Sequence, residues 1–128
     1  MPYIKLDIYP VPTQSQAESL ARAMTRVMVD IMGKRGAVTA VHISSTPPLV
    51  WTVGDTPCTR PTAYVEIKIT AGSNSQDEKA ALIQQVWQIL LDTLGVLTEA
   101  SYTVIHEVAA ENWGYSGCTQ RDRQLAQA

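Results

Sequence analysis

The chain has 128 residues, the length of one domain, and carries a formal net charge of -2. It contains no run of lysine and arginine, which argues against nucleic acid or an anionic membrane as a partner, because both attract a concentrated basic surface. No stretch approaches the roughly 18 to 20 apolar residues of a membrane span, and the N-terminus lacks a signal-like segment, so we expect a cytoplasmic protein.

The first predicted element is an alternating strand over residues 2–8, and it begins with Pro2. If Met1 is removed, Pro2 becomes a terminus with a secondary amine. An α-amino group has a pKa of roughly 7.7 to 8.0, and burial lowers that value, so the amine could act as a base near pH 7. The alternative is that Pro2 simply starts a strand, where a missing N–H costs little.

The sequence contains an internal repeat, with two similar halves about 61 to 62 residues apart. The strand at 2–8 is matched by another at 63–69, and Thr13 with Gln16 and Ser75 with Glu78 form capping-box signatures that open two helices. Glycines at positions 33 and 95 end these helices. Each helix has one apolar face, formed by Leu20, Met24, Val27, Met28 and Met32 in the first and by Leu82, Val86, Ile89, Leu90 and Leu94 in the second.

Second strands are predicted at about 39–44 and 101–108, and a tryptophan follows each, Trp51 and Trp113. A right-handed crossover makes the two strands of such a unit parallel. We therefore predict one α+β domain, a two-layer α/β arrangement of two β-α-β repeats (about 2–60 and 63–125), with a four-stranded sheet and both helices on one face.

The second face of this sheet is predicted to be polar. The first strands of the two halves place there the side chains of Tyr3, Lys5, Asp7, Tyr64, Glu66 and Lys68. Such a face would be bare in a monomer, so we expect an oligomer in which these faces surround a wet centre; the alternative is simple solvation.

The remaining chemistry-bearing residues predict no cofactor and no metal site. Cys58 and Cys118 lie far apart in the sequence, without the spacing of a zinc or redox pair. His42 and His106 each fall in a predicted strand, where a hydrogen-bonded structural role is expected.

Several segments resemble the tautomerase superfamily. The run at 33–42, with Trp51 and the Pro57-Cys58 pair, resembles the macrophage migration inhibitory factor branch, and the segment at 107–117 resembles the end of the 4-oxalocrotonate tautomerase branch. The resemblance covers nearly the whole chain. It implies the tautomerase fold, an N-terminal proline base, a homotrimer, and a small 2-oxo acid or enol as substrate.

The topology and the resemblance together predict a site at the end of the sheet where Pro2 lies. Pro2 would move the proton, Lys34 would bind the substrate carboxylate or the developing enolate, and Trp113 would line the pocket. Arg35 and Asn74 are further substrate-binding candidates. A solvated Lys34 at a helix C-terminus and a packing role for Trp113 are the alternatives.

The sequence also departs from its relatives. The arginine that the 4-oxalocrotonate branch carries after its first strand is absent from 10–12 and 72–74, and a second family arginine falls at Ala40 or Tyr102. A small monocarboxylic substrate of the phenylpyruvate type is therefore favoured. One alternative is a hydratase, dehalogenase or decarboxylase on the same fold, in which Glu111 or Asp55 would activate water. The other is a non-catalytic trimeric binding protein.

Overall fold

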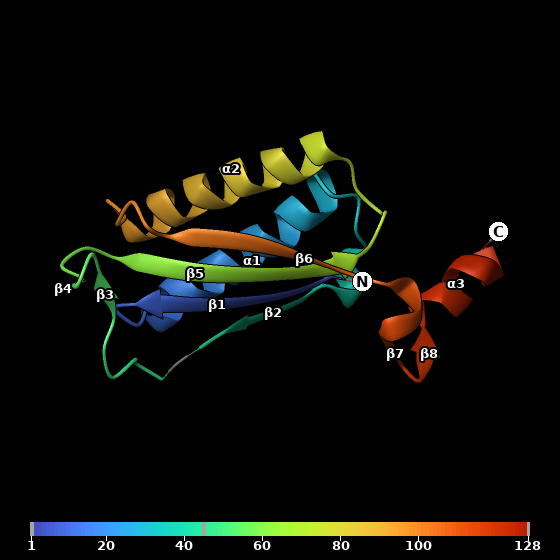
Figure 1. Cartoon of the computed structure of the whole chain (residues 1–128), viewed down its shortest axis with the longest axis horizontal. Helices are drawn as coiled ribbons and strands as arrows, with labels where there is room; N and C mark the ends of the chain where they lie inside the picture. Colours follow the sequence, from blue (N-terminus) through green and yellow to red (C-terminus); the bar gives the residue numbers. More distant parts are fainter. Residues whose placement is uncertain (1, 45, 128) are drawn as a thin grey trace.

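A four-stranded sheet forms one layer of the structure, a computed structural model that describes residues 2–44 and 46–127. The strands are β1 (Tyr3–Tyr9), β2 (Ala40–Ile43), β5 (Thr62–Thr70) and β6 (Tyr102–Val108), in the order β2-β1-β5-β6. The helices α1 (Gln14–Asp30) and α2 (Gln76–Leu94) cover the same face of this sheet (Figure 1). The predicted two-layer α+β fold is confirmed.

The direction and register of the strand pairs determine which strand ends lie side by side. Strand β2 is parallel to β1, and β6 is parallel to β5, as right-handed crossovers require. The two central strands, β1 and β5, are antiparallel, with Tyr3 opposite Lys68 and Tyr9 opposite Thr62. The start of β1 therefore lies beside the end of β5.

Both predicted capping boxes open their helices. The Thr13 side chain accepts a hydrogen bond from the Gln16 N–H at 3.1 Å, and the Gln16 side chain accepts one from the Thr13 N–H at 3.0 Å. Ser75 and Glu78 exchange the same two bonds at the start of α2. Each box satisfies two N–H groups that the helix itself leaves without partners, so the local sequence decides where the helix begins.

The core fills the space between the sheet and the two helices. Alternate side chains of β1 and β5 point into it, because successive residues of a strand face opposite sides. Its largest fully buried side chains are Ile4, Leu6, Leu20, Met24, Met28, Ile67, Ile69, Leu82, Leu90, Val65 and Val86. These include most of the apolar residues predicted for the helix faces.

The other face of the sheet is not covered by a helix (Figure 1). It carries the polar residues predicted for it, and its side chains are more exposed than those of the core face, as in β1, where buried and more exposed positions alternate. Tyr102, which stands in register beside Tyr64, keeps 62% of its surface exposed. A face of this kind is available to a ligand or to another copy of the chain.

Several short elements were not predicted. The hairpin of β3 (Thr52–Val53) and β4 (Thr56–Pro57) follows Trp51. A second hairpin, β7 (Gly114–Tyr115) and β8 (Cys118–Thr119), leads into a third helix, α3 (Gln120–Gln127), and these last elements extend away from the sheet (Figure 1). Two 3₁₀ turns, η1 (Gly36–Val38) and η2 (Ala110–Asn112), complete the described chain.

A candidate active site at the Pro2 end of the sheet

Four segments meet at the end of the sheet where β1 begins. Pro2 precedes β1, and residues 34–39 precede β2, whose first residue Ala40 donates its N–H to the Pro2 carbonyl oxygen at 3.2 Å. Residues 71–75 follow the end of β5, and residues 109–113 follow the end of β6. Pro2 itself is buried. Met1, whose removal the proline chemistry requires, lies outside the described residues.

The turn after α1 determines the backbone position of Lys34. Gly33 has a φ of +68°, a conformation that side-chain-bearing residues rarely adopt. The Gly33 N–H bonds to the Val29 carbonyl oxygen at 3.2 Å, as in the αL helix-ending motif, and the Lys34 N–H bonds to the carbonyl oxygen of Met28 at 3.0 Å. The backbone at Lys34 is thereby fixed next to the loop that follows β5.

The Lys34 ammonium group reaches across to that loop. Its Nζ donates a hydrogen bond to Ser73 Oγ at 2.8 Å. The side chain is half-buried, and burial lowers its pKa below the ordinary value because the charged form loses hydration, while the Glu78 carboxylate opposes the shift by favouring the charged form. Lys34 is therefore a partly desolvated cation, whose attraction for an anion is stronger than that of a fully solvated lysine.

Ser73 is held by its own loop. Its hydroxyl donates to the Thr70 carbonyl oxygen at 2.6 Å, so one of its oxygen lone pairs is left to accept from Lys34. At Gly72, φ is +76°, and its N–H donates to Glu107 Oε2 at 3.3 Å. The contact of Ser73 with Lys34 could not be predicted from the sequence, because a serine in a loop has many possible partners.

Asn74 links the turn after α1 to the first turn of α2. Its Nδ2 donates to the Met32 carbonyl oxygen at 3.0 Å and to Glu78 Oε1 at 3.3 Å. Both amide hydrogens are thus in use, and the Oδ1 atom lies 3.3 Å from Ser73 Oγ. These contacts hold the loop in place. The substrate contact expected of Asn74 stays a prediction, because its amide hydrogens already bond to other residues of the chain.

Trp113 lies at the same end as Pro2. Its indole Nε1 donates to Thr70 Oγ1 at 3.2 Å, and Thr70 is the last residue of β5. The Trp113 carbonyl oxygen accepts from the Gln120 N–H at 2.9 Å, which ties the tryptophan to α3. The ring is half-buried, so its apolar faces are available to line a site.

Arg35 points to a different set of partners. Its Nη1 lies 3.5 Å from the Tyr115 hydroxyl, and the Arg123 guanidinium stacks over the Tyr115 ring at 3.7 Å. Arg123 also donates to the Tyr115 carbonyl oxygen at 2.9 Å. Two arginines therefore flank one tyrosine, an arrangement that sequence reasoning missed because α3 was not predicted.

The opposite end of the sheet lacks the same groups. Ala63 stands where the second half would need a proline, and the position 62 residues after Lys34 is Val96, which is 67% exposed. Asp55, one candidate for activating water, is exposed in the β3–β4 turn at that far end. Glu111, the other candidate, is exposed in η2 and lies at the Pro2 end.

The described residues contain neither a cluster of metal-binding side chains nor a helix able to span a membrane. Among residues 2–44 and 46–127, no group of three or more His, Cys, Asp or Glu side chains is arranged to hold a metal ion. In the same part of the chain, none of the helices combines the length and the apolar character needed to span a bilayer.

Comparison with known proteins identifies the family. The family described as "Tautomerase enzyme" matches residues 64–123, which is the second β-α-β unit and the tail that carries Trp113. The curated protein "Probable tautomerase K2" of Dickeya dadantii (strain 3937) is 37% identical over 65 residues, covering 49% of this chain and 97% of that protein. The chain belongs to the tautomerase family, and it is about twice as long as this relative.

Solved structures agree with the fold. A protein titled "Pt0534 Inactivated by 2-Oxo-3-pentynoate" has a TM-score of 0.84 at 15% identity, over 94% of this chain and 98% of that one. A "F6 fused 4-OT wild type asymmetric trimer" has a TM-score of 0.82 at 20% identity, again over 94% and 98%. At these identities the likeness shows a shared tautomerase fold, as the resemblance implied.

The electrostatic coupling of Lys34 to Glu78 gives a testable result. In an NMR titration of the lysine Cε and Nζ signals, the Lys34 pKa should lie below the ordinary value for lysine. Glu78→Gln should lower it further, because the carboxylate that favours the charged form is gone. Glutamine at this position still completes the capping box, so the helix is expected to remain.

The matched control is Asp92→Asn, which removes a carboxylate from the other end of α2. It should leave the Lys34 titration unchanged. An ordinary lysine pKa in the unmodified protein, or equal effects of the two substitutions, would contradict this description of the site.

Proposed function

We propose that this tautomerase-family enzyme interconverts the keto and enol forms of a small 2-oxo acid, with the nitrogen of Pro2 as the general base after removal of Met1. The observation that carries this proposal is the position of Lys34. A half-buried cation lies at the same end of the sheet as a buried proline, and the two are separated in sequence by an entire strand and helix.

The proposed chemistry moves one proton. In ketonisation the neutral Pro2 nitrogen takes the proton of the enol hydroxyl and delivers a proton to the neighbouring carbon, so the nitrogen ends the cycle as it began. Burial of Pro2 supports this role, because loss of hydration disfavours the charged amine and favours the free base near neutral pH.

Lys34 is proposed to bind the substrate carboxylate or to stabilise the negative oxygen that forms as the proton moves. A cation that is already fixed and partly desolvated suits this role, since little reorganisation is needed when charge develops. Ser73 would hold the ammonium group in place through its 2.8 Å contact. Trp113 would supply an apolar wall, and Arg35 a second anion partner.

A monocarboxylic substrate fits these residues best. The arginine that the family resemblance places at position 40 or 102 is absent, because these positions hold alanine and tyrosine. The similar protein inactivated by 2-oxo-3-pentynoate shows that a small 2-oxo monocarboxylate reaches a protein of this fold. Phenylenolpyruvate is the proposed assay substrate, because it joins a 2-oxo acid to an apolar ring that Trp113 could contact.

We further propose that the chain forms a homotrimer through its uncovered sheet face. The fused relative with a TM-score of 0.82 is titled a trimer. The exposed Tyr102 and the polar residues around it would then border a central space instead of bulk solvent.

The proline mechanism predicts the effect of Pro2→Ala. The protein with Met1 removed should ketonise phenylenolpyruvate, and the substitution should lower kcat/KM by about tenfold or more, because a general base contributes about 10²- to 10⁴-fold and alanine leaves a primary amine in its place. Ketonisation is followed by ultraviolet absorbance, and mass spectrometry establishes the N-terminus of each sample.

Pro12→Ala, which removes a proline before α1, serves as the control and should keep the activity. Incubation with 2-oxo-3-pentynoate should attach the compound to the N-terminal peptide, because a neutral amine adds to an alkyne conjugated with a ketone. Equal rates for Pro2→Ala and the parent protein, or full activity with Met1 retained, would refute the mechanism.

The proposed role of Lys34 predicts a separation of binding from stability. Lys34→Ala should raise KM by about tenfold, the loss of one charge-assisted contact. The free energy of unfolding should change by no more than about 0.5 kcal/mol, as for other substitutions outside the core. Steady-state kinetics and urea unfolding measure the two effects, and a large loss of stability with an unchanged KM would mark Lys34 as structural.

The proposed assembly predicts a mass in solution. Sedimentation equilibrium should give three times the 14.0 kDa of one chain. Tyr102→Glu should lower that mass by placing a charge on the uncovered sheet face, whereas Val29→Glu, on the outer side of α1, should not. A monomeric parent protein, or equal effects of the two substitutions, would exclude this interface.

A further inference from the structure

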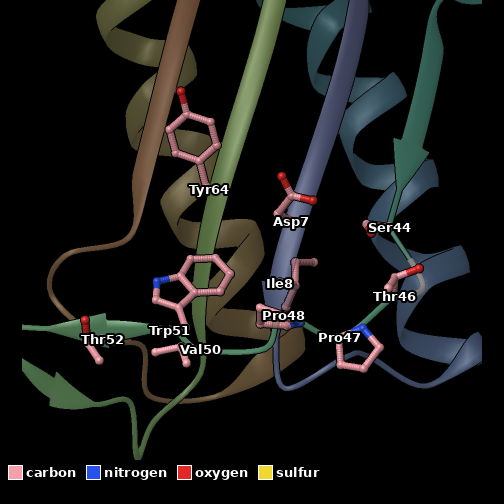
Figure 2. A pocket seen from close by; sticks show the side chains of 10 residues that line it. All are labelled: Asp7, Ile8, Ser44, Thr46, Pro47, Pro48, Val50, Trp51, Thr52 and Tyr64. Carbon is pink, nitrogen blue, oxygen red and sulfur yellow. The ribbon is translucent and has the colours of Figure 1, made fainter.

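A pocket lies at the end of the sheet away from Pro2. It has a volume of about 660 Å³ and opens on the uncovered sheet face beside the loop that follows β2. Figure 2 shows its lining: the side chains of Asp7, Ile8, Ser44, Thr46, Pro47, Pro48, Val50, Trp51, Thr52 and Tyr64. The proposed reaction uses none of these residues, so this pocket needs a separate explanation.

Asp7 gives the pocket its charge. The carboxylate is half-buried on the uncovered face, directly opposite Tyr64 in the antiparallel pair of β1 and β5. Within the described part of the chain it has no ion pair and accepts no hydrogen bond. Lys5, the next residue of β1 on this face, stands opposite Glu66 instead. Asp7 is therefore a carboxylate whose charge is left for a ligand.

Two aromatic rings accompany the carboxylate. Tyr64 rises from β5, and Trp51 is held at the start of the β3–β4 hairpin, where its carbonyl oxygen accepts from the Cys58 N–H at 3.1 Å. Figure 2 shows the two rings along β5 and the Asp7 carboxylate on the neighbouring strand, and all three residues line the pocket. The faces of tyrosine and tryptophan attract cations, and most strongly where water is partly excluded.

The strand position that carries Asp7 at this pocket has the opposite charge at the Pro2 end. The residue that follows Asp7 by 61 positions is Lys68, which stands opposite Tyr3 at the Pro2 end of the sheet. Among the described residues that line the pocket there is no lysine, arginine or histidine. A carboxylate ligand would thus meet an unbalanced negative charge, whereas a cation would neutralise it.

We propose that this pocket binds a small organic ammonium ion with an apolar body, its cationic group on Asp7 and its body against Trp51 and Tyr64. The three hydroxyls of Ser44, Thr46 and Thr52 supply further acceptors for an N–H group. The proposed catalytic reaction does not enter this inference, so either can fail alone.

The test is isothermal titration of the full-length protein, in its native assembly, with phenethylammonium. We expect a Kd of about 1 mM or tighter. The neutral 2-phenylethanol and the anionic 3-phenylpropionate match its apolar body, and both should bind at least about tenfold more weakly, because they cannot pair with the carboxylate.

Asp7→Asn keeps the shape of the side chain and removes its charge, and it should weaken phenethylammonium binding by about tenfold. Trp51→Leu should weaken it by about threefold or more. Glu66→Gln removes a carboxylate from the same sheet face outside the pocket and should leave binding unchanged. Circular dichroism of each variant checks that it folds.

Three results would overturn the proposal. The first is no measurable heat, as expected if a neighbouring copy of the chain fills the pocket in the assembly. The second is equal binding of the ammonium, the alcohol and the carboxylate. The third is an unchanged affinity in a folded Asp7→Asn protein.

Discussion

The antiparallel pairing of β1 with β5 is the constraint on which the rest of the molecule depends. It sets Ile4 against Ile67 and Leu6 against Val65, so that both strands turn their apolar side chains toward the helices. A slip of one residue would move those side chains to the uncovered face. The register is thus fixed by the core, and it also decides which loops meet at each end of the sheet.

Because β1 and β5 run in opposite directions, each crossover contributes a different loop to the same end. The turn after α1 brings Lys34, and the loop before α2 brings Ser73. Neither segment is near Pro2 in sequence, yet the topology places all three at one end. The location of the candidate site therefore follows from the strand directions in the sheet. Its contacts depend on the two turns at Gly33 and Gly72.

The parts of the fold that could be predicted are those with local signals. Capping boxes and apolar periodicity each lie within a few residues, and both helices begin where Thr13 and Ser75 indicated. Helix α3 has a capping signal, because the Asp122 N–H donates to Thr119 Oγ1 at 3.0 Å. It lacks the second signal, since Leu125 and Ala126 are its two apolar residues and no apolar stripe forms. Its arginine stacking on Tyr115 was consequently missed.

The contacts of the candidate site were harder to predict than its location. Topology alone indicated that Lys34 and the loop at 72–74 share one end of the sheet. The choice of Ser73 over Asn74 as the partner of Lys34 depends on side-chain directions across 39 residues of chain, which no local pattern encodes. Asn74 shows the same limit, because its amide hydrogens are used by Met32 and Glu78.

The two ends of the sheet are far enough apart to act independently. Asp7 and Pro2 are separated by five residues of extended strand, about 16 Å at roughly 3.3 Å per residue. The Debye length at physiological salt is about 8 Å, so the charge of Asp7 is largely screened at the Pro2 end. The binding of an anion at Lys34 would therefore have little effect on the binding of a cation at Asp7. The duplicated scaffold thus carries a partly buried cation, Lys34, at one end of the sheet and a partly buried carboxylate, Asp7, at the other, and the proposed selectivity of each end follows from that single residue.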